Sequence, residues 1–230
     1  MVANSLRARV RAEMIEEIKT VARRHLATDG ANLSLRAVAR DLGMVSSAIY
    51  RYFPSRDDLL TALILEAYVA LGDTVEAADA AVDRDDLRGR WLAGCRAARA
   101  WALANPAEYA LLYGSPVPGY AAPDDTVEPA QRPPQTLLGI LRDGLAAGQL
   151  TPPPADDLPK PVQDDLAAIV ASLFPDVPAA LLARGMAGWT QLFGLISFEL
   201  FGRINGALPH RDEYFDHQIA LMADLIGLPR

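Results

Sequence analysis

The chain has 230 residues, of which 51% are hydrophobic and 22% are charged. This balance excludes a disordered chain, and the length allows one large or two modest domains with a real core. The formal net charge is −7, but residues 1–56 contain ten basic and five acidic side chains, whereas the rest contains twelve and 24. A basic N-terminal segment followed by an acidic body indicates that the N-terminal part binds a negatively charged polymer such as DNA.

One apolar face marks the first predicted helix. Its residues recur at four-residue spacing, with Val21 beside them: Val10, Met14, Ile18, Ala22 and Leu26. Such a repeat, close to 3.6 residues, is typical of an amphipathic helix. Gly30 follows, and glycine accepts the left-handed backbone that ends many helices, so we expect the helix to end there.

The next stretch predicts two short helices separated by a turn. Ser34 is a good N-cap for the first of them, and Gly43 supplies the turn. The second is predicted to run from about Ser46 to Tyr52, because the residue before Pro54 avoids helical dihedrals. Two short helices joined in this way are typical of a helix-turn-helix, which lays its second helix in the major groove of DNA.

The second short helix carries the side chains that a DNA-reading helix needs. Its first residues are small, so its backbone can approach base edges, and its last are polar or basic, which suits phosphates. Ile49 and Phe53 are expected to face the core, and Arg36 with the N–H groups after Ser34 to bind a further phosphate. The predicted DNA contacts are Ser34, Arg36, Ser46, Ser47, Ala48, Tyr50, Arg51, Tyr52 and Arg56. The alternative is an ordinary helical hairpin with a solvated basic face.

The rest of the chain also has helical patterns. Ser55 is expected to cap a longer helix that reaches about Ala78. Proline- and glycine-rich connections are predicted at 114–134, as an ordered flap or a surface loop, and at 149–161. Further helices are predicted at 87–104, 106–113, 136–147, 162–174, 179–205 and 212–226. Because no β-alternation is evident, we predict an all-α protein with an N-terminal three-helix helix-turn-helix domain and a larger helical domain.

Two runs of residues, Ala39–Gly43 and Ala48–Leu60, resemble the tetracycline-repressor (TetR) family of bacterial transcriptional regulators. The resemblance implies that Tyr50 contacts a phosphate of the DNA backbone. It implies the same of the basic residue that opens the following helix, here Arg56.

Two residues depart from the family pattern. Val45 stands where a capping serine is usual, so Ser46 is expected to cap the helix, and Tyr52 stands where histidine is usual. The resemblance further implies a DNA-binding domain over residues 1–58. Residues 59–230 would then form an effector-binding and dimerisation domain.

The predicted helix at 179–205 is apolar nearly all round, so it must be covered on both sides. We expect the second cover to be a partner subunit, with the last two helices, 179–205 and 212–226, forming a four-helix bundle with their copies. The alternative is a central helix of a monomer.

A ligand pocket is predicted in the acidic body, where aromatic residues concentrate. Residues Trp189–Gly194 are similar to the Trp…His-Gly signature of one TetR C-terminal subfamily, with Phe193 in place of histidine. A mostly apolar pocket with a few polar groups suits a small apolar or aromatic ligand. The candidate contacts are Trp101, Tyr109, Tyr113, Phe174, Trp189, Gln191 and Phe193. The alternative for each is a place in the core.

An enzyme finds little support in the sequence. The single cysteine, Cys95, excludes an internal disulfide and fits a reducing compartment. His210 and His217 lack zinc-ligand spacing, so we expect no metal and no cofactor. The longest uncharged apolar run, 185–198, is shorter than the roughly 20 residues of a membrane helix. The first residues lack the apolar core of a signal peptide, and we expect a cytoplasmic protein.

Together these patterns predict a homodimeric repressor that binds double-stranded DNA at a palindromic operator and is released by a small-molecule effector. Two alternatives stay open. One is a regulator of the same fold that activates transcription or has no inducer. The other is a small helical enzyme or carrier in which the basic segment is incidental.

Overall fold

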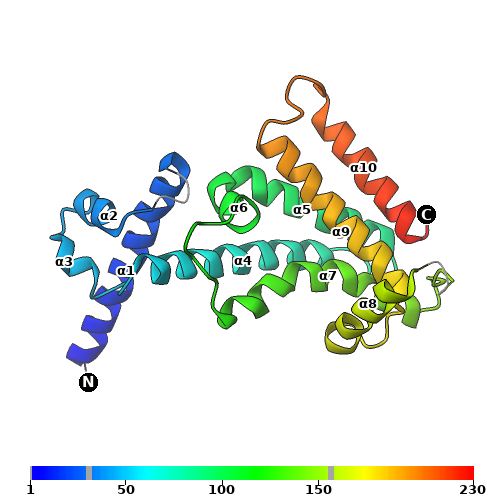
Figure 1. Cartoon of the computed structure of the whole chain (residues 1–230), viewed down its shortest axis with the longest axis horizontal. Helices are drawn as coiled ribbons and strands as arrows, with labels where there is room; N and C mark the ends of the chain where they lie inside the picture. The colour runs from blue at the N-terminus through cyan, green and yellow to red at the C-terminus, as the bar shows by residue number, and fades with distance from the viewer. Residues whose placement is uncertain (1, 30–32, 155–157) are drawn as a thin grey trace. The chain divides into compact units, whose positions relative to one another are not determined.

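Figure 1 shows the computed structural model of the chain, which describes residues 2–29, 33–154 and 158–230. All regular structure in these ranges is helical, so the predicted all-α fold class is confirmed. Gly30, predicted to end the first helix, lies outside the described residues. The helices are α1 (Val2–Asp29), α2 (Leu35–Asp41), α3 (Ser46–Ile49), α4 (Arg56–Ala80), α5 (Leu87–Ala104), α6 (Pro106–Tyr113), a 3-10 turn η1 (Asp124–Thr126), α7 (Val127–Ala146), α8 (Lys160–Leu173), α9 (Ala179–Leu200) and α10 (Arg211–Ile226).

The helices form two compact units. The first comprises residues 1–68 and 105–129, and the second comprises 69–104 and 130–230. Helix α4 therefore contributes its first half to one unit and its second half to the other. The predicted division at residue 58 into DNA-binding and effector parts stays a prediction.

The core of the first unit is built from one face each of α1, α2 and α4 together with α3. Ile18 and Ala22 of α1 and Val38 of α2 are completely buried, as the apolar spacing predicts. Val10, the first residue of the predicted stripe, is instead 50% exposed. The stripe therefore starts later than predicted, because the first turns of α1 extend past the helices that would cover them.

The segment that follows α5 also packs in the first unit. Helix α6 contacts α1, and Leu111 of α6 and Val117 join the same hydrophobic core. The hydroxyl groups of Thr61 on α4 and Tyr120 lie 2.9 Å apart and share a hydrogen bond. Part of the predicted 114–134 connection is therefore ordered against the helix-turn-helix bundle.

The second unit is a helical layer around α5 and α9. Helix α9 packs against α8, α5 and α10, and Figure 1 shows α9 and α10 running side by side. Trp91 of α5 is completely buried, and its indole N–H donates to the carbonyl oxygen of Ile219 at 3.1 Å. Cys95 is also completely buried, and burial raises the pKa of its thiol. Cys95 therefore behaves as a small buried hydrophobic residue of the core.

Helix α7 begins at Val127, earlier than the predicted start at 136, and contains Pro133 and Pro134. Proline lacks an N–H, so two carbonyl groups in the preceding turn lose their helical partners. Contacts with α4 hold this turn in place: the Arg132 guanidinium donates to Asp73 at 2.6 Å and to Glu76 at 2.7 and 2.8 Å. The sequence therefore predicts too long a connection at 114–134, because the contacts that hold the start of α7 in a helix come from α4, far away in the chain.

Helix α9 ends at Leu200 rather than at the predicted Asn205. Gly202 takes a φ of +74°, a left-handed conformation that favours glycine. The N–H groups of Gly202 and Arg203 donate back to Glu199 and Phe198 at 3.1 and 2.8 Å. This pair of bonds is a Schellman motif, which closes a helix at its C-terminus.

Candidate nucleic-acid interface

The turn between α2 and α3 has the geometry that the sequence predicts. Gly43 has a φ of +67°. Its N–H donates to Arg40 at 3.0 Å, and the N–H of Met44 donates to Ala39 at 2.8 Å, which is again a Schellman motif. An L-residue at position 43 would be strained in this conformation, so glycine sets the angle between the two helices.

Side-chain caps fix the helices on either side of α3. Ser34 accepts a long hydrogen bond, 3.5 Å, from the N–H of Ala37 at the start of α2. Ser55 accepts from the N–H of Asp58 at 3.1 Å and donates to its carboxylate at 2.6 Å at the start of α4. Both predicted caps are confirmed, and both orient their helices with respect to α3.

Helix α3 is shorter than predicted and begins differently. Its N-cap is Val45, which has no capping oxygen, so the predicted Ser46 cap is wrong. The helix ends at Ile49, and residues 50–52 continue as a turn, closed by the N–H of Phe53 donating to the Ile49 carbonyl at 3.0 Å. Without a side-chain cap, a helix of one turn depends on its neighbours for stability.

Two faces of this segment have opposite environments. Ile49 is completely buried and Phe53 is nearly so, which confirms that they face the core. Of the predicted contacts around them, Ala48 and Tyr52 are half-buried. The exposed ones are Ser34, Arg36, Ser46, Ser47, Tyr50 and Arg51. The exposed set offers hydroxyl groups, a phenol and guanidinium groups together, which is the chemistry that base edges and phosphates require.

Arg56 has a structural contact in addition to its predicted role. It is half-buried, and its Nε donates to the carbonyl oxygen of Leu33 at 3.0 Å, which holds the segment before α2 against the start of α4. Its Nη1 lies 3.7 Å from the Asp57 carboxylate. The DNA contact of Arg56, like those of the other eight residues, stays a prediction.

Sequence reasoning missed Arg11 on α1. Its Nη2 donates to the carbonyl oxygen of Arg51 at 2.9 Å, and its guanidinium carbon lies 5.2 Å from the centre of the Tyr52 ring. A signal was present, since Arg7 and Arg11 are four residues apart and share a helix face. The sequence alone does not tell that this face of α1 lies beside Arg51 and Tyr52.

An ion network links the other end of α1 to α4 and α6. Lys19 is nearly buried and pairs with Glu16 and Glu66, and Arg23 pairs with Glu66 and Glu108. Burial lowers the pKa of Lys19, whereas its hydrogen bonds to the two glutamates raise it, with a net rise. Lys19 is therefore charged at neutral pH, and the network holds the helix-turn-helix bundle to α6.

Of the seven candidate ligand contacts, Tyr109 and Tyr113 belong to the first unit. Their ring centres are 5.2 Å apart, and Tyr68 meets Tyr113 edge-on at 6.3 Å. Burial raises the pKa of Tyr113 and of Tyr68, so both phenols are neutral at physiological pH. This cluster offers neutral hydroxyl groups among aromatic rings.

The other five candidates belong to the second unit. Trp101, Phe174 and Phe193 are buried, and the Trp189 and Phe193 rings are in contact, with centres 4.1 Å apart and planes tilted by 47°. Gln191 is exposed, and its amide donates to Gln218 of α10 at 3.2 Å. A polar group in this position faces solvent rather than an enclosed cavity. All seven ligand contacts stay predictions.

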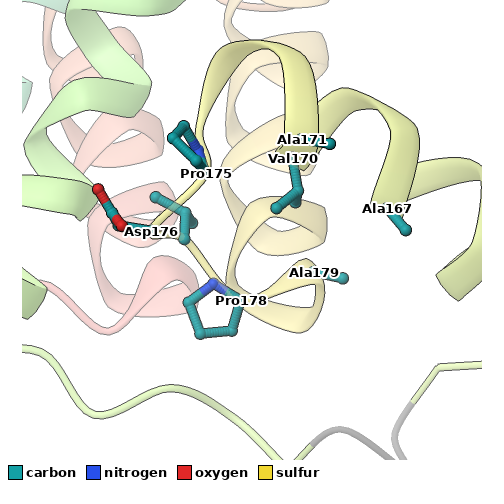
Figure 2. A pocket seen from close by; sticks show the side chains of 8 residues that line it. Ala167, Val170, Ala171, Pro175, Asp176, Pro178 and Ala179 are labelled. Atoms are coloured by element: carbon teal, nitrogen blue, oxygen red, sulfur yellow. The ribbon is translucent and has the colours of Figure 1, made fainter.

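A hollow of about 500 Å³ lies where the chain passes from α8 to α9. Figure 2 shows the side chains that line it. It is lined mainly by small residues and prolines: Ala167, Val170, Ala171, Pro175, Asp176, Val177, Pro178 and Ala179. None of the seven candidates lines it. Its polar side chain, Asp176, is exposed.

Among the residues that the structure describes, no three His, Cys, Asp or Glu side chains are grouped as metal ligands would be. No helix in this part of the chain is long and apolar enough to cross a bilayer.

Two family descriptions match the chain. "Bacterial regulatory proteins, tetR family" covers residues 18–63, and "Tetracyclin repressor-like, C-terminal domain" covers residues 91–222. The first match contains α2, the turn at Gly43, and α3. The second covers more than half of the chain and most of the second unit.

Relatives of known sequence and solved structures agree with these matches. HTH-type transcriptional regulators Rv1816 of Mycobacterium tuberculosis and Mb1846 of Mycobacterium bovis are each 39% identical over 225 residues, which cover 96% of this chain and 94% of the relative. The crystal structure of regulatory protein SCO4313 is 34% identical with a TM-score of 0.76, covering 94% of this chain and 98% of that one. RolR, solved in complex with resorcinol, shares the fold at 16% identity and a TM-score of 0.52, covering 96% and 97%. The chain thus belongs to the TetR family and is a DNA-binding transcriptional regulator, not an enzyme.

Proposed function

We propose that this regulator is a homodimeric repressor, which binds a palindromic operator through α3 and leaves it when a small apolar or aromatic ligand binds the helical body. It acts in the cytoplasm, where a bacterial regulator meets its DNA. The observation that carries the proposal is the division of α3 and the following turn into two faces, with Ile49 and Phe53 buried and Ser46, Ser47 and Arg51 exposed.

The exposed face of α9 and α10 supports a dimer. Phe198 on α9 and Leu221 and Leu225 on α10 are large apolar side chains that lie open to solvent. Beside Gly194 a Cβ atom would meet nothing within 4 Å apart from the adjoining backbone of α9 itself, so another helix could approach closely there. Apolar surface of this kind is typical of an interface with a second subunit.

Contacting aromatic residues in each unit support a ligand of matching chemistry. The tyrosine cluster of the first unit provides aromatic faces and neutral hydroxyl groups. In the second unit the Trp189 and Phe193 rings provide apolar faces. An aromatic ring with one or two hydroxyl substituents would pack against such rings and hydrogen-bond to such hydroxyl groups. RolR, which shares the fold, was solved in complex with a compound of this kind, resorcinol.

Footprinting on the DNA that flanks the gene, with and without a panel of phenols and other small aromatic compounds, tests the proposal. We expect a two-fold symmetric footprint that one class of compound removes and that Arg51→Ala weakens, because Arg51 is exposed next to α3. By linkage, a compound that weakens DNA binding must be bound less tightly by the protein–DNA complex.

The alternatives give different results. A footprint that no compound changes favours a regulator without a small-molecule inducer. Transcription that rises in vitro when the protein binds favours an activator. An unchanged footprint with Arg51→Ala contradicts the face assigned to DNA.

A further inference from the structure

The first turns of α1 extend beyond the core that holds the rest of the helix. Every residue from Leu6 to Glu13 is exposed, and burial along α1 begins only with the half-buried Met14. Leu6 is 52% exposed although it is apolar. Since helices in proteins are stabilised mainly by packing, an unpacked extension of two turns needs another reason to persist.

Arg11 places this extension beside α3. Its guanidinium donates to the Arg51 carbonyl oxygen at 2.9 Å and lies 5.2 Å from the Tyr52 ring centre. Arg51 and Tyr52 come directly after α3, next to the exposed Tyr50. The extension thus flanks the end of the helix that reads the bases.

The extension carries a second basic residue on the face of α1 that contains Arg11. Residues 6–12 contain Arg7, Arg9 and Arg11 and no acidic residue. Arg7 is one helical turn, about 6 Å, further out than Arg11 on the same face. Arg9 lies on a different face and pairs with Glu13 at 3.7 Å, where both side chains are largely exposed.

We propose that Arg7 and Arg11 bind the phosphate backbone of duplex DNA just outside the base pairs that α3 reads, so that the start of α1 is a second DNA-contacting element of each half-site. The inference rests on operator binding through α3 and goes beyond it, because it lengthens the half-site. Two guanidinium groups about one helical turn apart can each bind a separate phosphate oxygen. The contacts carry no base sequence information and add affinity and register.

The test compares the full-length protein with its Arg7→Ala and Arg9→Ala variants on the footprinted duplex, with affinities measured by fluorescence anisotropy across a salt series. Each phosphate contact contributes about 0.9 to the slope of log K against log[salt]. Arg7→Ala, which removes one contact from each subunit, should make the slope shallower by about 1.8 for a dimer. Arg9→Ala, the matched control, should leave the slope close to that of the wild type.

A second comparison locates the contact. When the duplex is shortened stepwise from both ends, the difference between wild type and Arg7→Ala should vanish while the central footprint is still bound. Equal slopes for wild type and Arg7→Ala on the long duplex would overturn the inference. So would an equal loss with Arg9→Ala, which would indicate a diffuse charge effect. If the wild type binds no duplex at all, operator binding itself fails, and the extension of the half-site fails with it.

For Arg11, charge and structural contact can be separated. Arg11→Lys keeps the positive charge but loses the planar guanidinium that contacts Arg51 and Tyr52. We expect this variant to retain the wild-type salt slope, whereas Arg11→Ala should make the slope shallower. A shallower slope with both variants would mean that Arg11 only positions the turn after α3, and would overturn its assignment to phosphate.

Discussion

Arg90 is the most buried cation of the described residues, with 1% of its surface exposed. Its Nε donates to Asp79 at 2.8 Å, its Nη2 donates to Asp143 at 2.8 Å, and its Nη1 donates to the Arg84 carbonyl oxygen at 3.3 Å. Burial raises the pKa of Asp143, but the hydrogen bond and charge of Arg90 lower it, with a net fall. The guanidinium therefore joins α4, α5 and α7 through two carboxylate groups and a carbonyl oxygen.

Removing one partner should be costly. Asp79→Ala leaves the Arg90 charge buried and poorly compensated, so we expect the free energy of unfolding to fall by about 3–5 kcal/mol. The control is Asp216→Ala, which breaks the exposed pair with Arg96 and should cost less than about 1 kcal/mol. Urea unfolding followed by circular dichroism measures both. If both variants lost a similarly small free energy of unfolding, the remaining partners of Arg90 would be enough to compensate its charge without Asp79.

At the scale of the element, α7 is held by tertiary contacts rather than by its own sequence. Because Pro133 and Pro134 donate no hydrogen bond, the turn before them depends on Arg132 and its acidic partners on α4. We predict that Arg132→Ala increases hydrogen exchange at the amides of residues 130–132. The buried residues 137–141 should keep their protection.

Arg142→Ala is the control for this prediction, since Arg142 is on the same helix, is exposed, and pairs only weakly with Asp143 at 3.4 Å. Hydrogen exchange measured by mass spectrometry or NMR resolves the two segments. If exchange at 130–132 were the same in wild type and Arg132→Ala, the proline-containing turn would be stable without α4.

The helices show which features the sequence can predict. Helices α5 and α6 have the predicted bounds, because Pro106 is a local signal for the start of α6 and Gly114 is one for its end. The start of α7 was missed because it depends on ion pairs with residues more than 50 positions away. Such ion pairs cannot be predicted from neighbouring residues, and Pro133 and Pro134 by themselves predict a break in the helix that the ion pairs stabilise.

The candidate interface follows the same division. The turn at Gly43 and the inward positions of Ile49 and Phe53 follow from residue spacing and were predicted. The place of Arg11 beside Tyr52 depends on how α1 crosses the end of α3, which periodicity does not contain. The basic face of α1 was therefore visible in the sequence, but its position relative to α3 was not.

At the scale of the whole molecule, the proposed repressor needs two subunits. A single reading helix contacts one half-site, and a palindrome presents two half-sites about 34–36 Å apart along the duplex. If the dimer forms through α9 and α10 as proposed, we expect affinity for the complete operator to depend on their exposed apolar side chains, of which Phe198, at 56% exposed, is the most open.

We predict that Phe198→Glu separates the subunits, because a carboxylate would lose its hydration in an apolar interface. Sedimentation at micromolar concentration should show a dimer for the wild type and a monomer for the variant. Val69→Glu, which places the same charge on an exposed apolar position of α4, should leave the dimer intact.

The Phe198→Glu monomer should bind a complete operator no more tightly per subunit than an isolated half-site, because the second contact is no longer intramolecular. A variant that stays dimeric would move the interface away from α9, and one that is monomeric yet binds the operator with wild-type affinity would remove the need for a dimer.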